Sequence, residues 1–253
     1  MILDGWGIAT NPNISAVDQA RTPYIQSLYK KYPHSKLEAS GLAVGLPAGQ
    51  MGNSEVGHMN IGAGRVVYQD LVRVNKAIED KELDNNPTLV EAFTYAQKNN
   101  KAVHLIGLLS DGGVHSHINH VKGLTTIAHH FGLTQVFIHA FTDGRDTDPK
   151  GGEAYLTELQ QHLAKTTGTI ATVTGRYFAM DRDKRWERVK LAYDAMVHGV
   201  GEATTDVLAA VRKSYQANIT DEFIKPIIAT TKDGHPVATL HEGDVVLCFN
   251  FRT

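Results

Sequence analysis

Polar loops rich in arginine, aspartate and histidine follow four apolar runs of strand length. In one-letter code these loops are residues 110–117 (SDGGVHSH), 142–148 (TDGRDTD), 175–185 (GRYFAMDRDKR) and 250–252 (NFR). Ligands of open α/β sheets bind beyond the carboxyl ends of the strands, so we expect the four loops to meet at one edge. Because a guanidinium fork matches phosphate and carboxylate groups, several arginines in one crevice suit a small, doubly negative ligand. The candidate binding residues are His115, Arg145, Asp146, Arg176, Arg182 and Arg252.

Two of these loops allow other interpretations. Residues 181–185 could be a solvated helix start held by charge pairs four residues apart. His115 and His117 could be a metal pair, although two imidazoles do not complete a site, and loop hydrogen bonding is the alternative. His104 and His139 fall inside expected strands, where we predict interior histidines with satisfied hydrogen bonds.

Two further candidates lie near the N-terminus. Asp4 follows a short strand-like start, and Ser54 precedes a helix-like stretch. The backbone N–H groups at a helix N-terminus favour an anion, so a serine there could carry an alkoxide or a phosphoryl group. For an isolated serine, simple capping of the helix is the ordinary explanation.

The pattern of apolar residues predicts the elements that would position these loops. From about residue 69 it alternates between helix and strand, which is typical of a mainly parallel sheet with helices on both faces. Residues 1–68 differ, because they combine one helix (23–31) and a short strand (35–39) with long glycine-rich loops. The later strands are predicted at residues 102–109, 135–141, 169–173, 227–230 and 245–251, with helices at 69–83, 87–98, 118–131, 153–165, 186–196 and 206–216.

Composition excludes several classes of function. The 253 residues carry a net charge of −2, which gives no electrostatic footprint for nucleic acid. No apolar run approaches the roughly 18 residues that a membrane helix requires, and the first residues lack a signal-peptide pattern, so a cytoplasmic location is expected. The single cysteine, Cys248, lies in an apolar run, where we predict a buried and inert thiol.

Six motifs occur in order along the whole chain. They are residues 3–7 (LDGWG), 49–58 (GQMGNSEVGH), 110–117 (SDGGVHSH), 143–147 (DGRDT), 175–186 (GRYFAMDRDKRW) and 249–252 (FNFR). Together they resemble the motifs of the cofactor-independent phosphoglycerate mutases, members of the alkaline phosphatase superfamily. The resemblance implies an incomplete phosphatase-like domain (1–68) and most of an inserted α/β transferase domain with a mainly parallel sheet (69–253).

The resemblance also implies a reaction. A protein of this kind interconverts 3-phosphoglycerate and 2-phosphoglycerate through a phosphoserine, with Ser54 as the nucleophile and Asp146 as the acid/base partner of the glycerate hydroxyls. Asp4 and Ser54 match two ligands of one of two Mn²⁺ sites, and a monomer is expected. The substrate-binding residues would be His115, Arg145, Asp146, Arg176, Arg182 and Arg252. A serine needs an activator, and because no nearby histidine offers a base, metal activation fits.

The remaining metal ligands of the family have no match in this sequence, so we expect an N-terminal part of such an enzyme that is inactive alone. A phosphatase or another phosphomutase of the same superfamily is the enzymatic alternative. A fragment that binds phosphoglycerate without turnover is the non-catalytic alternative, and a truncated gene product without a function of its own is the third.

Overall fold

The computed structural model describes residues 1–252, which form two compact units. The first unit is Met1–Val72, and the second begins at Arg73, inside helix α4 (Asp70–Glu79). None of the helices within the described residues is both long and apolar enough to span a bilayer.

The first unit consists of short helices joined by loops, with a small apolar cluster of Val44, Leu46 and Val56. The strand predicted at residues 35–39 is wrong, because this segment stays irregular and only an isolated antiparallel bridge joins Ser40 to Met51. The helices are η1 (Pro12–Ile14), α1 (Ala16–Gln19), α2 (Pro23–Lys31), η2 (Gly41–Val44) and α3 (Ser54–Ala63).

Close backbone contacts account for two glycines of this unit. Gly45 has a φ of 80°, and a Cβ atom there would lie 2.0 Å from the carbonyl oxygen of Val67. A Cβ atom on Gly52 would lie 1.8 Å from the carbonyl oxygen of Ala39. The glycine-rich loops are therefore held against neighbouring backbone, which only glycine permits at these positions.

The second unit is an α/β domain with a six-stranded sheet in the order β4-β5-β3-β2-β1-β6. Every pairing is parallel except that of β3 with β5. The predicted fold class, α/β with a mainly parallel sheet, is confirmed. The strands are β1 (Val103–Leu109), β2 (Val136–Thr142), β3 (Thr169–Gly175), β4 (Glu202–Thr204), β5 (Ile227–Ala229) and β6 (Val245–Cys248). The helices after α4 are η3 (Leu83–Asn85), α5 (Pro87–Asn99), α6 (Ile118–His130), α7 (Gly152–Leu163), α8 (Arg176–Ala179), α9 (Trp186–His198), α10 (Val207–Gln216) and η4 (Asp221–Phe223).

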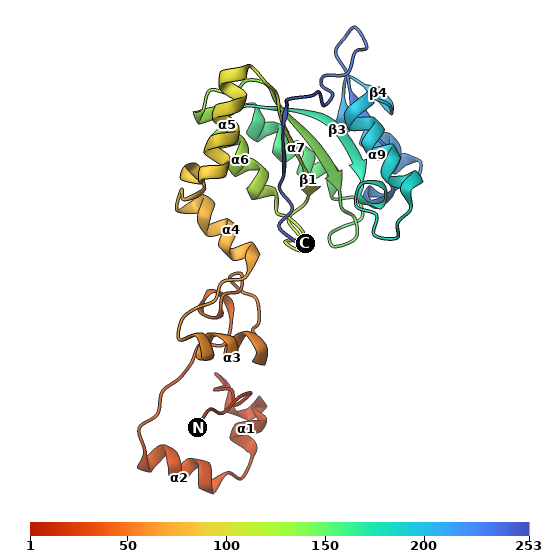
Figure 1. The fold of residues 1–253 in the computed structure, drawn as a ribbon. Helices are drawn as coiled ribbons and strands as arrows, with labels where there is room; N and C mark the ends of the chain where they lie inside the picture. Colours follow the sequence, from red (N-terminus) through yellow and green to blue (C-terminus); the bar gives the residue numbers. More distant parts are fainter. Residues whose placement is uncertain (253) are drawn as a thin grey trace. The chain divides into compact units, whose positions relative to one another are not determined.

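One large apolar core lies on one face of the sheet. Helices α5, α6, α7 and α10 bury their apolar sides there, against alternate residues of the strands. Helix α9 buries Ala192 and Ala195 outside this cluster. Figure 1 shows α7 behind the sheet and α9 in front of it, so helices cover both faces.

Strand β6 is an edge strand that is shorter than predicted. The predicted strand 245–251 leaves the sheet after Cys248, and Phe249 then packs on β1, where a Cβ atom on Gly107 would lie 2.6 Å from the Phe249 ring. The prediction of a buried thiol is wrong, because Val246 and Cys248 lie on the exposed side of this edge strand.

Candidate functional site

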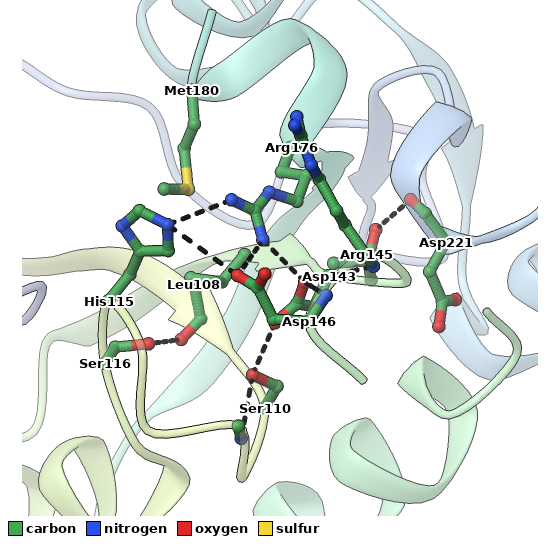
Figure 2. A network of polar contacts seen from close by, with 12 residues as sticks. Leu108, Ser110, His115, Ser116, Asp143, Arg145, Asp146, Arg176, Met180 and Asp221 are labelled. Atoms are coloured by element: carbon green, nitrogen blue, oxygen red, sulfur yellow. Dashed lines mark hydrogen bonds and ion pairs between the residues drawn. The ribbon is translucent and has the colours of Figure 1, made fainter. Parts of the chain in front are cut away.

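Three neighbouring parallel strands end in polar residues that contact one another. Ser110, Asp143 and Arg176 directly follow the ends of β1, β2 and β3. The Ser110 hydroxyl donates to Oδ2 of Asp143 at 2.8 Å, and Nη1 of Arg176 donates to Oδ1 of Asp143 at 2.7 Å. Figure 2 shows these side chains converging beyond the strand ends. The sheet therefore gathers the predicted loops at its carboxyl edge, as expected for this topology.

Asp143 is the buried centre of this network. Besides Ser110 and Arg176, its carboxylate accepts from the backbone N–H groups of Arg145 at 3.2 Å and Asp146 at 3.0 Å. Burial alone would raise the pKa of Asp143, but the hydrogen bonds from Asp146, Ser110, Arg176 and Arg145 outweigh it and lower the pKa. Asp143 belongs to the motif at residues 143–147, but the sequence pattern alone assigns it no role. Its place directly after a buried strand was the available signal.

Arg176 connects Asp143 to two of the predicted site residues. Its Nη1 also donates to Oδ2 of Asp146 at 2.6 Å, and its Nη2 lies 3.0 Å from Nε2 of His115. The side chain of Arg176 is only 7% exposed, so two carboxylates balance a nearly buried charge. Hydrogen bonds to these carboxylates raise the pKa of Arg176 against the opposite effect of burial.

The contact with Arg176 fixes the protonation state of His115. A guanidinium can only donate, so Nε2 of His115 accepts and the ring proton lies on Nδ1. Burial and the charge of Arg176 both lower the pKa of His115, which agrees with a neutral ring. The 3.7 Å separation between His115 and Asp146 is therefore not an ion pair in this state.

Backbone contacts hold His115 in place. The backbone N–H of Phe251 donates to the carbonyl oxygen of His115 at 2.8 Å, and the Ser116 hydroxyl donates to the carbonyl of Leu108. The segment after β6 is thereby joined to the loop after β1, which brings Arg252 beside His115. His117 instead accepts from the N–H of Asn119 at the start of α6, so the two histidines make separate contacts.

Three of the predicted arginines surround this network without being neutralised by it. Arg145, Arg182 and Arg252 are exposed, and none forms an ion pair with any residue among 1–252. Besides burial and Arg176, the charges of Arg252 and Arg182 also lower the pKa of His115, so both lie within electrostatic reach of the ring. Figure 2 shows the Arg145 side chain pointing away from the Asp143–Arg176 contacts.

The loop that carries Arg182 is ordered by Asp181. The Asp181 carboxylate accepts from the N–H groups of Asp183 at 3.2 Å and Arg185 at 2.8 Å, and it pairs with Arg188 at 3.1 Å. The side chain of Asp181 is 2% exposed. Residues 181–185 are therefore a loop before α9 that Asp181 holds in place, with residues 182–185 exposed. The alternative of a solvated helix start is right about their exposure, but the helix begins only at Trp186.

Asp4 and Ser54 lie together in the first unit. The Ser54 hydroxyl donates to Oδ2 of Asp4 at 2.7 Å, and both residues are exposed. Ser54 is the first residue of α3, whereas Asn53 caps this helix by accepting from the N–H of Val56. Asn53, and not Ser54, therefore caps this helix.

A histidine that is not among the predicted site residues lies next to Ser54. Nδ1 of His58, one helical turn further on, lies 2.9 Å from the carbonyl oxygen of Ser54 and 3.2 Å from its Oγ. Because a carbonyl oxygen only accepts, Nδ1 of His58 carries the proton and donates to it. His58 therefore offers no base to Ser54 in this arrangement. The spacing of four residues on one helix was the signal that could have located it.

The predicted site residues thus form two groups, one in each unit. The model of a family described as "BPG-independent PGAM N-terminus" matches residues 74–253. This chain belongs to that family. The resemblance seen in the six sequence motifs is confirmed.

Relatives of this BPG-independent phosphoglycerate mutase family extend the similarity to the whole chain. The chain is 57% identical to the 2,3-bisphosphoglycerate-independent phosphoglycerate mutase of Flavobacterium johnsoniae and 58% identical to that of Flavobacterium psychrophilum. Both comparisons cover 100% of this chain and 50% of the relative. The chain therefore spans about half the length of the curated relatives it matches.

A solved phosphoglycerate mutase structure has a similar fold. The chain is similar to phosphoglycerate mutase of Leishmania mexicana, in crystal structures determined at low cobalt concentration, with a TM-score of 0.74 and 35% identity. This comparison covers 99% of the present chain and 48% of the Leishmania chain.

Proposed function

We propose that this chain provides the phosphoglycerate-binding part of a 2,3-bisphosphoglycerate-independent phosphoglycerate mutase. The arrangement of Arg176, Asp146 and His115, with exposed arginines around it, carries the proposal. In the assignment that follows from the family, residues 1–68 belong to the metal-binding phosphatase domain and residues 69–253 to the substrate-binding transferase domain.

The charges of the site suit a phosphorylated hydroxy acid. Arg145, Arg182 and Arg252 are free of carboxylate partners among the described residues and can bind a phosphate and a carboxylate. Arg176 is already balanced by Asp143 and Asp146, so it contributes mainly by orienting these carboxylates. The ligand favoured by this set is 3-phosphoglycerate or 2-phosphoglycerate.

Proton transfer falls to Asp146. Its side chain is 24% exposed, so a ligand can reach it, and Arg176 holds it by Oδ2. Asp146 would protonate the glycerate oxygen that leaves phosphorus and would take the proton of the hydroxyl that attacks next. His115, neutral and with Nδ1 protonated, would donate a hydrogen bond without adding charge.

Ser54 would carry the phosphoryl group between these two steps. Its Oγ would attack phosphorus, the bond from phosphorus to the 3-oxygen would break, and the 2-hydroxyl would later take the group back. Asp4 and Ser54 are two hard oxygen donors in contact, which fits part of a Mn²⁺ site. A bound cation would favour the alkoxide of Ser54 and offset the charge of the phosphoryl group.

The described residues offer few ligands for a metal ion. Residues 1–252 contain no cluster of three or more His, Cys, Asp or Glu side chains that could hold a metal ion. Because a hard divalent cation takes about six oxygen ligands, Asp4 and Ser54 alone would bind it weakly. The proposal therefore includes phosphoglycerate binding without turnover by the 253-residue chain, together with a monomeric state and a cytoplasmic location.

Calorimetry with the purified chain tests the binding. We expect 3-phosphoglycerate to bind, and Arg182→Ala and Arg252→Ala each to weaken binding by about tenfold or more, since a charge-assisted hydrogen bond contributes about 1.5–3 kcal/mol. Lys232→Ala, at an exposed position in a loop after β5, is the matched control. Absence of binding, or equal binding of unrelated phosphomonoesters, would contradict the proposal.

A second measurement separates the alternatives. A mutase assay with added Mn²⁺ and mass spectrometry of Ser54 after exposure to substrate would reveal turnover and phosphoserine. Binding without either favours a substrate-binding part. Release of phosphate from several esters would instead favour a phosphatase or another phosphomutase of the superfamily.

A further inference from the structure

We propose that Asp143 is a positioning residue of this site, and that it acts through Arg176 to fix the Asp146 carboxylate and the His115 ring. The inference rests on the proposed function for its link to phosphoglycerate, but its structural core can be tested without a ligand.

Every oxygen of the Asp143 carboxylate is used by the protein. Oδ2 accepts from the Ser110 hydroxyl, and Oδ1 accepts from Arg176 and from the backbone N–H groups of Arg145 and Asp146. The side chain is 2% exposed. Asp143 is therefore placed to orient other groups, and a ligand has no access to it.

Asp143 also determines which N–H donors of Arg176 remain free to bind a ligand. Nη1 of Arg176 has two hydrogens, which go to Asp143 and to Asp146. One hydrogen of Nη2 goes to His115. The hydrogen on Nε and the second hydrogen on Nη2 are the donors without a partner among residues 1–252. The orientation of the whole guanidinium follows from the two carboxylates that hold Nη1.

The same carboxylate joins three separate chain segments. Ser110 follows β1, Asp143 follows β2 and Arg176 follows β3, and Asp143 is 33 residues away from each of the other two in the sequence. Asp146 is attached twice, by its own N–H to Asp143 and by its side chain to Arg176. Removal of the Asp143 charge would therefore loosen Arg176, and with it both groups that would face the ligand.

Side-chain NMR of the complete chain tests the first link. The proton–nitrogen signals of Arg176, assigned by their loss in Arg176→Lys, report how firmly the guanidinium is held. In Asp143→Asn we expect hydrogen exchange at Nη1 to accelerate by about tenfold or more, as the loss of a charge-assisted hydrogen bond requires. Asp148→Asn, an exposed aspartate of the same loop, is the matched control and should leave the signals unchanged.

If Asp143→Asn does not fold, a second variant tests the same link. Ser110→Ala removes only the hydroxyl that orients Oδ2, and we expect it to accelerate exchange at Arg176 by about two- to fivefold, in line with the loss of one hydrogen bond. Unchanged exchange in a folded Asp143→Asn, or in Ser110→Ala if the first variant does not fold, would overturn the inference.

A double-mutant cycle tests the link to the ligand. We expect Asp143→Asn to weaken 3-phosphoglycerate binding by about tenfold in the natural chain but by less than about threefold in a chain that carries Arg176→Lys. Additive effects would show that Asp143 does not act through Arg176. If the natural chain binds no phosphoglycerate, the proposed function fails, while the exchange measurement still decides the role of Asp143.

Discussion

Nδ1 of His104 lies 2.9 Å from Nε2 of His139, and both rings are fully buried. The chain of contacts continues from His139 to Thr172 Oγ1 at 2.9 Å and from His104 to Asp244 Oδ2 at 3.4 Å. Four polar groups thus follow one another across β3, β2, β1 and the residue before β6. The prediction that both histidines are interior is confirmed, and their hydrogen bonds explain why the sheet tolerates them.

Acid should destabilise the domain through these histidines. Burial, and to a lesser extent His104, lowers the pKa of His139 to about 3, so the folded chain keeps this ring neutral where the unfolded chain takes up a proton. The neutral His139 ring therefore makes its full contribution to the free energy of unfolding above about pH 6.5. This contribution is lost as the pH falls towards 3, by up to about 4 kcal/mol for His139 alone. Urea unfolding at several pH values should show a smaller decline in His139→Gln than in the natural chain. His130→Gln, at an exposed position in α6, should keep the full decline, and identical slopes for both variants would contradict the assignment.

Loss of Arg176 should cost stability as well as binding. Arg176→Met keeps most of the side-chain volume but leaves the buried Asp143 carboxylate without its cation. We expect a decrease of about 3–5 kcal/mol in the free energy of unfolding, because an uncompensated charge remains buried. Denaturant titration measures this decrease. The matched control, Arg212→Met, breaks an exposed ion pair with Glu153 and should change stability little. Equal effects of the two substitutions would refute a special role for the buried pair.

Asp221 should tolerate asparagine better than alanine. Its buried carboxylate accepts from the Tyr215 hydroxyl at 2.5 Å and the N–H of Gly152 at 2.7 Å, and burial raises its pKa. Asp221→Ala leaves both donors unpaired, so we expect a loss of roughly 2–4 kcal/mol. Asp221→Asn keeps an acceptor for Gly152 and can donate to Tyr215.

The pH dependence provides the check on Asp221. A carboxyl group whose pKa is raised by folding destabilises the folded chain while it is ionised, and this penalty disappears as pH falls through the folded pKa. Asp221→Asn should therefore compare more favourably with the natural chain at pH 7 than at pH 4 in thermal unfolding. The opposite order would mean that the carboxylate is stabilised by its surroundings.

Gly107→Ala should weaken the attachment of β6. The new methyl group would lie 2.6 Å from the ring of Phe249, which is 6% exposed and packed on β1. We expect a loss of about 1–3 kcal/mol from overpacking, measured by denaturant unfolding. Gly62→Ala in α3, where a Cβ atom meets no atom within 4 Å, should be neutral or slightly stabilising. Phe249→Leu should restore part of the loss in Gly107→Ala, and a lack of rescue would place the strain elsewhere.

The sequence predicted the strands with long apolar runs well. The starts and ends of β1, β2 and β3 differ from prediction by at most two residues, because these strands are continuous and buried. The three-residue strand β4 was not predicted, since so short a run carries little periodicity. Residues 249–251 look like a strand but leave the sheet, because the Asn250 side chain accepts from Leu108 N–H and Phe251 N–H donates to His115.

The site was predictable to the extent that topology alone determines it. Because the loops after parallel strands meet at one edge of the sheet, we expected His115, Arg176 and Asp146 to lie near one another. The structure places them in contact. The role of Asp143 depends on which oxygen faces which donor, and no spacing in the sequence contains that information. The exposure of Cys248 was missed because an apolar run does not reveal that its strand lies at the edge of the sheet.

The position of β6 in the sheet has a consequence for the order of folding during synthesis. On one side β1 pairs with β2, the next strand along the sequence. On its other side β1 pairs with β6, far along the sequence, where Val103 lies opposite Val245. A ribosome that adds about 5–20 residues per second needs several seconds or more between these two segments. Until then one edge of β1 has no strand beside it. During synthesis the unpaired edge of β1 must therefore be kept from pairing with strands of neighbouring chains. This matters most on polysomes, where several growing chains lie close together.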